Sequence, residues 1–131
     1  MKEFERISDS LEKLASDVVD AALKVHKSLG PGLLESVYEI CLRHELHIRG
    51  HQVRIQVPVP VTYEGVTLDA ALRIDMLIDE QLIVELKAVD TMLPVFEAQL
   101  LTYLKLTGKR LGLLINFNVP VIRDGIRRII L

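Results

Sequence analysis

Three charged residues stand in the most strand-like segment of the chain, RIDMLIDEQLIVELKAVD at residues 73–90. Asp75 lies in the first apolar half of this segment, and Glu85 and Lys87 lie in the second half. Side chains alternate across a strand, so Glu85 and Lys87 point to the same face. If the two halves pair as a hairpin that is symmetric about Glu80, Asp75 lies directly opposite Glu85. The pattern therefore predicts two carboxylates and a lysine close together in an apolar sheet.

Opposed carboxylates in such a sheet need a compensating charge, because like charges across strands destabilise a sheet and an unpaired buried carboxylate is costly. A divalent cation supplies that charge, and carboxylate oxygens suit Mg²⁺ or Mn²⁺, which also bind water and phosphate oxygens. Lys87 would then stabilise charge on a phosphate or orient the attacking water. The alternative is a structural ion pair of Lys87 with Glu85 or Asp75, without a metal.

Further polar residues recur at helical spacing. Gln99 and Tyr103 are four residues apart and share a helix face, where both could donate hydrogen bonds to phosphate or water. Alternatively, Tyr103 is a core aromatic residue and Gln99 is simply exposed. Glu35 shares a face with Tyr38 and is a third candidate carboxylate, unless it is a solvated helix residue. His26 is a candidate metal ligand, or a favourable contact with a helix dipole.

The composition fits a single domain over residues 1–131, since half of its residues are hydrophobic and its net charge is −2. No apolar run reaches the roughly 18 residues of a membrane span, and the N-terminal segment lacks the apolar stretch of a signal peptide. One cysteine, Cys41, excludes an internal disulfide framework, so we expect a cytoplasmic protein without a membrane partner. The spacing of His44, His47 and His51 is not typical of a zinc site.

Hydrophobic periodicity and turn residues predict the elements that position these side chains. They are helices at 9–27 and 33–48, strands at 53–61, 66–78 and 81–89, a helix at 94–107, and strands at 110–117 and 125–131. Asp9 and Glu12 resemble a capping box at the start of the first helix. Pro58 and Pro60 cannot donate ladder hydrogen bonds, so the first strand is expected at a sheet edge.

The predicted order α-α-β-β-β-α-β-β indicates an α/β fold with a mixed sheet. Three consecutive strands favour an antiparallel meander, and the helix before the fourth strand favours a right-handed parallel crossover. Helices then cover the faces of the sheet. On the second strand, alternation predicts that Arg73, Asp75 and Leu77 share one face.

Several blocks of the chain together resemble a known family. The segment GLLESVY, residues 32–38, matches the G-x-x-E-x-x-Y signature of the GxxExxY protein family, which is placed in the PD-(D/E)XK nuclease superfamily. The similarity continues through AALKVHKSLGPGLLESVYE, RIDMLIDEQLIVELKAVD, EAQLLTYLKLTGKRLGLLINF and DGIRRII, in that order. It implies a restriction-endonuclease-like core, with an antiparallel meander followed by a parallel crossover, and so agrees with the order of elements.

The superfamily pattern falls on the residues described above. Asp75 stands where the PD element has its aspartate, with Ile74 in place of the proline. Glu85, Leu86 and Lys87 stand as the (D/E)XK element. The resemblance thus implies that these charged residues form the catalytic and metal-binding centre.

The resemblance also implies roles for residues outside that centre. Gln99 and Tyr103 look like the Q-x-x-x-Y motif of RecB-like exonuclease domains. Glu35 matches the acidic residue of an early helix that borders the metal site. The Leu86 backbone carbonyl is implied as a metal ligand, and His26 corresponds to an early histidine that joins the metal in RecB-like members.

These observations predict a metal-dependent nuclease that hydrolyses phosphodiester bonds with Mg²⁺ or Mn²⁺, with DNA favoured over RNA as the substrate. The C-terminal segment 105–131 has six basic side chains and one acidic side chain, which suits either a phosphate-binding edge or a solvated one. The alternative is a catalytically weak or inactive module that binds nucleic acid or protein, because the chain is close to a bare core. A homodimer could supply the missing surface.

Overall fold

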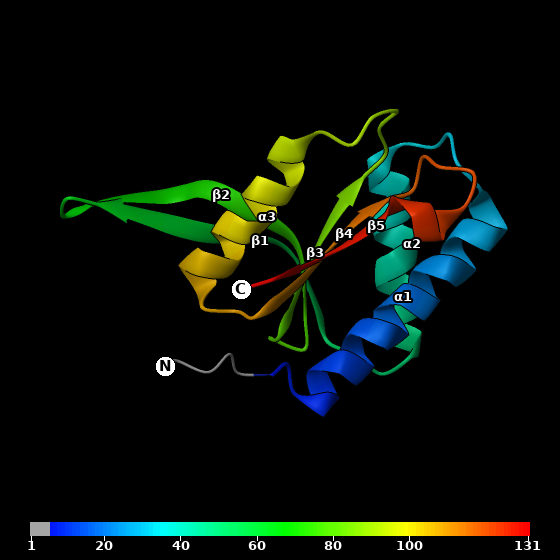
Figure 1. Cartoon of the computed structure of the whole chain (residues 1–131), viewed down its shortest axis with the longest axis horizontal. Coiled ribbons are helices and arrows are strands. Elements are labelled where there is room, and N and C mark those ends of the chain that lie inside the picture. Colours follow the sequence, from blue (N-terminus) through cyan, green and yellow to red (C-terminus); the bar gives the residue numbers. More distant parts are fainter. Residues whose placement is uncertain (1–5) are drawn as a thin grey trace.

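The computed structural model describes residues 6–131, except for the side chains of residues 70 and 71. Within this part, three α-helices flank a mixed sheet of five strands (Figure 1). The elements are α1 (Asp9–Leu29), α2 (Glu35–Ile48), β1 (Val53–Tyr63), β2 (Val66–Ile78), β3 (Leu82–Lys87), α3 (Pro94–Thr107), β4 (Leu111–Asn116), the 3₁₀ helix η1 (Ile122–Gly125) and β5 (Ile126–Ile130). The predicted order of helices and strands is confirmed, and η1 is an addition to it.

The strands lie in the sheet in their chain order, β1-β2-β3-β4-β5. Neighbouring strands are antiparallel except for β3 and β4, which are parallel and connected through α3. This arrangement confirms the meander, the parallel crossover and the edge position of β1. The strand that carries Glu85 and Lys87, β3, is therefore the central strand.

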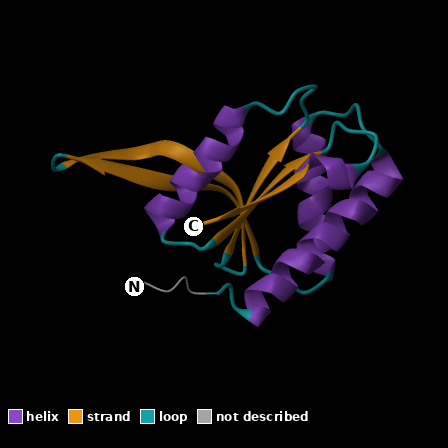
Figure 2. Cartoon of the chain, viewed as in Figure 1, coloured by secondary structure: helices purple, strands orange, loops and turns teal. Residues whose placement is uncertain are grey.

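The helices form two layers, with α1 and α2 side by side on one face of the sheet and α3 on the other (Figure 2). Each layer buries its own apolar cluster against the sheet. One cluster joins α1 and α2 to residues such as Met76 and Val84, and the other joins α3 to residues such as Leu77 and Ile83. Gly112 of β4 allows the second contact, since a Cβ there would lie 2.7 Å from the Leu100 side chain. No helix in the described part of the chain is long and apolar enough to span a membrane.

The ends of several elements differ from the predictions. Ser8, and not Asp9, caps α1, because its side-chain oxygen accepts a hydrogen bond from the backbone of Leu11 at 3.2 Å. The third strand ends at Lys87 instead of residue 89. Beyond that point the Asn116 side chain binds both the backbone N–H and the backbone carbonyl of Val89, so the ladder does not continue.

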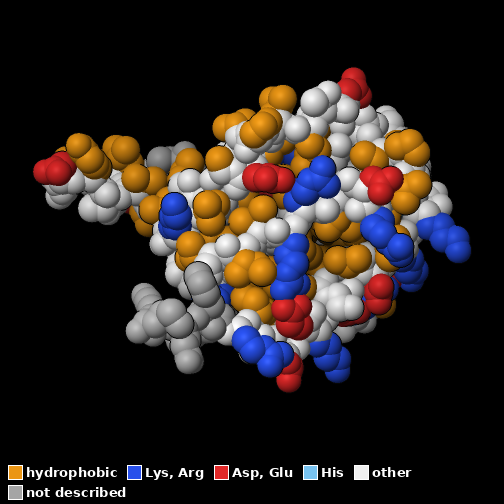
Figure 3. All heavy atoms as spheres, viewed as in Figure 1, with side chains coloured by type: hydrophobic (Ala, Val, Ile, Leu, Met, Phe, Trp, Pro, Cys, Tyr) orange, Lys and Arg blue, Asp and Glu red, His pale blue; other side chains and the backbone are white. Residues whose placement is uncertain are grey.

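The hairpin of β1 and β2 extends beyond the helices as an arm (Figure 1). Its outer part carries the exposed apolar side chains of Tyr63, Val66 and Leu68, which are 73%, 59% and 52% exposed. Hydrophobic atoms follow the arm toward its tip in the space-filling view (Figure 3). The inner part of the same hairpin, by contrast, is packed into the body of the protein.

The strand β1 changes the cluster against which it packs. Val53 and Ile55 pack on the α1/α2 side, whereas Val57 and Val59 are buried in the cluster under α3. Simple alternation would place all four side chains on one face. Gln56, between the two pairs, has φ 51°, a left-handed conformation that is unusual inside a strand. Inward-facing and outward-facing side chains alternate along this strand as predicted, but the inward-facing ones pack into two different clusters.

The strand β2 changes sides at the opposing position. Met76 is buried on the α1/α2 side, whereas Ile74 is buried under α3 together with Leu77. The prediction that Arg73 shares a face with Leu77 is therefore wrong, because Ile74 takes that place and Arg73 is exposed. Asp75 lies at the point of this change.

Candidate active site

The β2–β3 hairpin is symmetric about Glu80, as predicted. The paired positions are Met76 with Val84, Leu77 with Ile83, and Ile78 with Leu82. Asp79 and Glu80 have φ values of 50° and 57°, the left-handed conformation that a tight type I′ hairpin turn requires. The next position of this register sets Asp75 opposite Glu85.

Backbone pairing between β2 and β3 gives way to side-chain contacts at this position. The Leu86 N–H donates a hydrogen bond to Asp75 Oδ2 at 2.8 Å, and the Asp75 N–H donates to Glu85 Oε1 at 3.4 Å. Each carboxylate therefore binds the backbone of the opposite strand. Asp75 and Glu85 together are called the carboxylate pair below.

The carboxylate pair is electrostatically strained in the absence of a cation. Glu85 is only 6% exposed. Burial, a hydrogen bond with the Asp75 side chain and the Asp75 charge raise the pKa of Glu85 to about 10, although Lys87 opposes the shift. Glu85 is thus protonated at neutral pH. A divalent cation at this position would replace that proton.

Lys87 lies at the end of β3 and is not neutralised by a contact ion pair. Its Nζ lies 4.4 Å from the centroid of the Phe96 ring. Among residues 6–131, no carboxylate oxygen lies within the 4.0 Å of a salt bridge with Lys87. The charge still lowers the pKa of Glu85 and of Glu35, so it acts on the site from a distance. The structural ion pair considered for Lys87 is therefore not formed.

The first two turns of α2 bring two further carboxylates toward the pair. Partial burial and the Asp75 charge raise the pKa of Glu35, while Lys87 lowers it. Burial is also the main cause that raises the pKa of Glu39; a hydrogen bond from Gln56 lowers it and Asp75 raises it. Sequence reasoning missed Glu39. Its spacing of four residues from Glu35 was the available signal, since such residues share a helix face.

The helix α3 contributes a tyrosine and a glutamine. Tyr103 is 3% exposed within the cluster under α3. Burial raises the pKa of its hydroxyl, and the charges of Glu85 and Asp75 raise it further, while a hydrogen bond with Gln99 lowers it. Tyr103 is thus both a core aromatic residue and a protonated hydroxyl near the carboxylate pair. Gln99 is exposed and lies within hydrogen-bonding reach of that hydroxyl.

Tyr38 anchors the turn that precedes α2. Its hydroxyl donates a hydrogen bond to the Gly30 carbonyl at 2.6 Å and accepts one from the Leu33 N–H at 3.2 Å. Its ring stacks on Phe117 with centroids 4.5 Å apart. Gly32, with φ 98°, supplies the left-handed turn residue. The spacing of glycine, glutamate and tyrosine in GLLESVY therefore corresponds to a turn, a site-facing carboxylate and an anchor.

The contacts of His26 are with Val119 and Phe117 and not with the carboxylate pair. Its Nε2–H donates a hydrogen bond to the Val119 carbonyl at 2.8 Å, and the ring is 8% exposed beside Phe117. The histidine thus supports the loop after β4. A role as a metal ligand would require the ring to leave this contact or to use Nδ1.

The sequence was compared with models of known protein families. A sequence model described as the PD-(D/E)XK nuclease superfamily matches residues 12–129. The chain belongs to the PD-(D/E)XK nuclease superfamily. No curated protein and no solved structure matched the chain in two further searches. The matched region includes every polar residue of the site, and membership in the superfamily implies a nucleic-acid substrate.

The side chains of the site offer only a few ligands to a divalent cation. Within the described residues, no group of three or more histidine, cysteine or acidic side chains converges as a metal shell. The carboxylate pair supplies oxygen donors from two side chains. Mg²⁺ is commonly bound through one or two carboxylates, with water and substrate phosphate as its remaining ligands. The residues present therefore fit a hard cation with an open coordination sphere.

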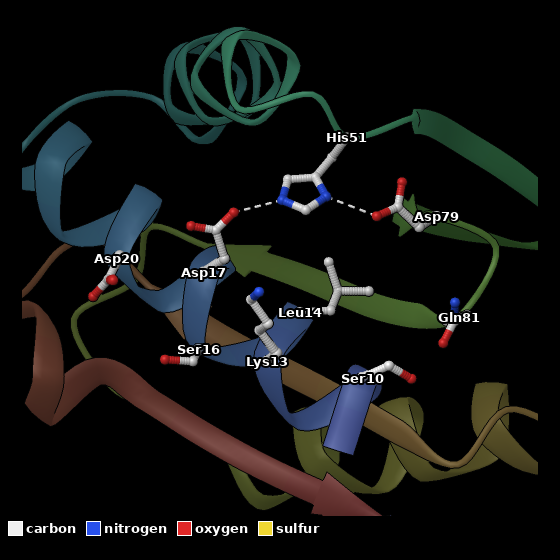
Figure 4. A pocket seen from close by; sticks show the side chains of 9 residues that line it. All are labelled: Ser10, Lys13, Leu14, Ser16, Asp17, Asp20, His51, Asp79 and Gln81. Carbon is white, nitrogen blue, oxygen red and sulfur yellow. Dashed lines mark hydrogen bonds and ion pairs between the residues drawn. The ribbon is translucent and has the colours of Figure 1, made fainter. Parts of the chain in front are cut away.

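A hollow of about 630 Å³ lies at the other end of β3, beside the β2–β3 turn and α1 (Figure 4). At its wall, His51 lies between two carboxylates, with Nε2 2.5 Å from Asp17 and Nδ1 2.7 Å from Asp79. Arg49 also binds Asp17 at 2.5 Å. The remaining lining residues are Ser10, Lys13, Leu14, Ser16, Asp20 and Gln81. Each acid in the wall that contacts His51 is already paired, so this network connects α1, the segment before β1 and the β2–β3 turn at the end of β3 away from the carboxylate pair.

Proposed function

We propose that this chain is a metal-dependent nuclease that hydrolyses phosphodiester bonds, with DNA preferred over RNA. The carboxylate pair carries the proposal, because a buried acid with a pKa of about 10 beside a second carboxylate favours replacement of its proton by a cation. Superfamily membership over residues 12–129 supports the same chemistry. We also propose that residues 1–131 form one nuclease-like domain.

The cation would be Mg²⁺ or Mn²⁺, held by Asp75, Glu85 and the Leu86 backbone carbonyl. Glu35 would become a further ligand only by moving its side chain toward the pair. When bound, it supplies Lewis-acid polarisation of the phosphate and a more acidic water. The Leu86 N–H donates its hydrogen bond to Asp75 Oδ2, which leaves Asp75 Oδ1 as the oxygen that would bind the cation. The Asp75 charge raises the pKa of Glu35 and the Lys87 charge lowers it, which supports a place for this exposed residue at the border of the site.

Lys87, Gln99 and Tyr103 would act on the substrate. The Lys87 ammonium stabilises negative charge that develops on the phosphate, because no contact carboxylate in residues 6–131 neutralises it. The Tyr103 hydroxyl keeps its proton and donates a hydrogen bond to a phosphate oxygen or to the attacking water. Gln99 orients that hydroxyl. These roles extend the GxxExxY and Q-x-x-x-Y resemblance to the reaction.

A nuclease panel tests the proposal. Wild type, Asp75→Ala and Lys87→Ala are assayed with Mg²⁺ and Mn²⁺ on single-stranded, duplex and branched DNA and on the matching RNA. Lys13→Ala, on the exposed side of α1, serves as the lysine control. We expect cleavage by wild type and the control, and its loss in both site variants. Robust cleavage by both site variants overturns the assignment, and binding of nucleic acid without cleavage by wild type favours a non-catalytic module.

The oligomeric state is a separate proposal. A chain that is close to the bare nuclease core has little surface beyond the site itself to hold a long substrate, so we propose a homodimer. Analytical ultracentrifugation with and without DNA tests this assembly. A monomer under both conditions contradicts it without affecting the assignment of the chemistry.

A further inference from the structure

Gln56 is held in an unusual conformation at the centre of β1. Its φ of 51° lies in the left-handed region, which residues other than glycine, asparagine and aspartate rarely adopt. The pairing on either side, Ile55 with Met76 and Val57 with Ile74, keeps one register. No residue is therefore inserted, and the left-handed residue lies directly opposite Asp75.

This local conformation coincides with the place where the hairpin changes sides. Before Gln56, β1 packs on the α1/α2 cluster, and after it β1 packs under α3. Across the ladder, the backbone pairs of β2 with β3 end at Met76, one residue from Asp75. Asp75 thus leaves the β3 ladder and uses its side chain to bind the Leu86 N–H. The left-handed conformation of Gln56 in β1 and the position of the Asp75 carboxylate in β2 therefore belong to one local distortion of the hairpin.

A glutamate of α2 holds this distortion from outside the sheet. The Gln56 side-chain amide donates a hydrogen bond to Glu39 Oε2 at 3.0 Å. Glu39 is half-buried and lies close enough to Asp75 for the two charges to repel. A third carboxylate so near the pair costs electrostatic energy, and the amide of Gln56 offsets part of it. The contact connects α2, which carries Glu35, to the strand opposite Asp75.

We propose that Glu39 and Gln56 are positioning residues. Their hydrogen bond stabilises the point at which the β1–β2 hairpin changes from the α1/α2 cluster to the cluster under α3, and this conformation places the Asp75 carboxylate against the Leu86 N–H. The role toward a cation rests on the proposed nuclease function. The role toward Leu86 rests on the fold alone. The hydrogen bond, and not the charge of Glu39, is the part that acts.

Two matched substitutions separate the hydrogen bond from the charge. Glu39→Gln keeps an amide oxygen that accepts from Gln56 but removes the charge, whereas Glu39→Ala removes both. Gln56→Gly removes the contact and at the same time tolerates the left-handed conformation. His44→Ala, an exposed residue on another side of α2, is the control.

The readout is hydrogen exchange of the Leu86 amide, which reports its bond to Asp75 without metal or activity. Asp75→Ala gives the rate without the acceptor. We expect exchange about 3- to 10-fold faster in Glu39→Ala and Gln56→Gly, the factor of one lost hydrogen bond, and a wild-type rate in Glu39→Gln and the control. The Gln56→Gly effect should appear without a lower Tm, which distinguishes positioning from a general loss of stability.

Mn²⁺ titration of the same variants provides the second readout. We expect weaker binding by a similar factor in Glu39→Ala and Gln56→Gly and unchanged binding in Glu39→Gln. Wild-type exchange rates in Glu39→Ala and Gln56→Gly overturn the proposal. A loss of Mn²⁺ affinity in Glu39→Gln equal to that in Glu39→Ala also overturns it, since the charge would then be responsible. If wild type binds no Mn²⁺, the cation site fails, while the Leu86 exchange rates still decide the positioning role.

Discussion

The carboxylate of Asp75 accepts a hydrogen bond at 2.8 Å from the backbone N–H of Leu86, the residue between Glu85 and Lys87. The aspartate is therefore fixed to the same backbone segment that carries the other two charged residues. A shift of β2 relative to β3 would have to break this bond before it could separate the three side chains. The geometry of the site thus depends on two adjacent strands and not on a flexible loop.

The buried acid Glu85 should make the metal-free protein less stable as the pH rises. Its folded-state pKa of about 10 lies above the ordinary value of 4.5, so this contribution to stability is complete below pH 4.5 and is lost as the pH rises through the folded pKa. Relative to Glu85→Gln, the free energy of unfolding should fall by at most about 1.4 kcal/mol per pH unit between these values. Urea unfolding in EDTA from pH 5 to pH 9 measures the difference, and parallel curves for the two proteins would contradict it.

Cation binding should stabilise the protein more strongly at higher pH. A cation competes with the proton on Glu85, so its apparent affinity should increase by up to about tenfold per pH unit below the pKa of that group. At a concentration 100 times Kd, the cation adds about 2.7 kcal/mol to the free energy of unfolding. Thermal unfolding with Mn²⁺ at pH 6 and pH 8 measures the shift. Asp75→Ala should show none, and an equal shift in this variant would place the cation elsewhere.

Removal of the Tyr103 hydroxyl should impair cleavage without impairing cation binding. Tyr103→Phe keeps the buried ring but removes a donor that lies near the carboxylate pair. We expect kcat to fall by about 10²-fold, as for the loss of one donor to a developing charge, with an unchanged Mn²⁺ titration. Tyr63→Phe, at an exposed tyrosine of the arm, is the control. An unchanged kcat in Tyr103→Phe would leave that residue with a packing role alone.

The hydroxyl of Tyr38 should contribute more to the free energy of unfolding than the hydroxyl of a surface tyrosine. Tyr38→Phe leaves the Gly30 carbonyl and the Leu33 N–H without their partner. The expected loss is about 1–3 kcal/mol of unfolding free energy, the range for an unsatisfied buried polar group. Denaturant unfolding measures it, and a loss as small as that of Tyr63→Phe would show that water replaces the hydroxyl.

The contribution of His51 should disappear in alkaline solution. Burial is the largest single effect and lowers the pKa of the ring, but the hydrogen bonds and charges of Asp17 and Asp79 outweigh it and raise the pKa above 6.5. The contribution is therefore complete below pH 6.5 and is lost as the pH rises through the folded value. The stability difference between wild type and His51→Gln should be larger at pH 5.5 than at pH 9.5. An equal difference at both would show that the neutral ring binds as well.

Much of this fold could be predicted because its signals are local. The period of the apolar residues predicted the helices and strands, and the assumed symmetry of the hairpin about Glu80 predicted the β2–β3 register that brings Asp75 to Glu85. The proline pair in β1 correctly indicated an edge strand. These features depend on the nearest neighbours in the chain, which the sequence displays directly.

The remaining features depend on contacts that are distant in the sequence. Periodicity reports that Ile55 and Val57 are both inward-facing, but not that they face two different cores. The left-handed conformation at residue 56 could not be predicted, because the residue is glutamine and not the glycine or asparagine that usually adopts this conformation. The partners of His51 lie 34 and 28 residues away, so its spacing from other histidines carried no information about them.

The central position of β3 also bears on when the site comes into being during folding. The β1–β2 and β2–β3 hairpins join neighbouring segments, whereas β3 pairs with β4, as Leu82 does with Leu111, across the intervening α3. Pairings between distant segments are the slow steps of folding. Without β4, one edge of the strand that carries Glu85 and Lys87 has no partner. The surroundings of Glu85 and Lys87 would therefore be complete only once β4 has paired with β3.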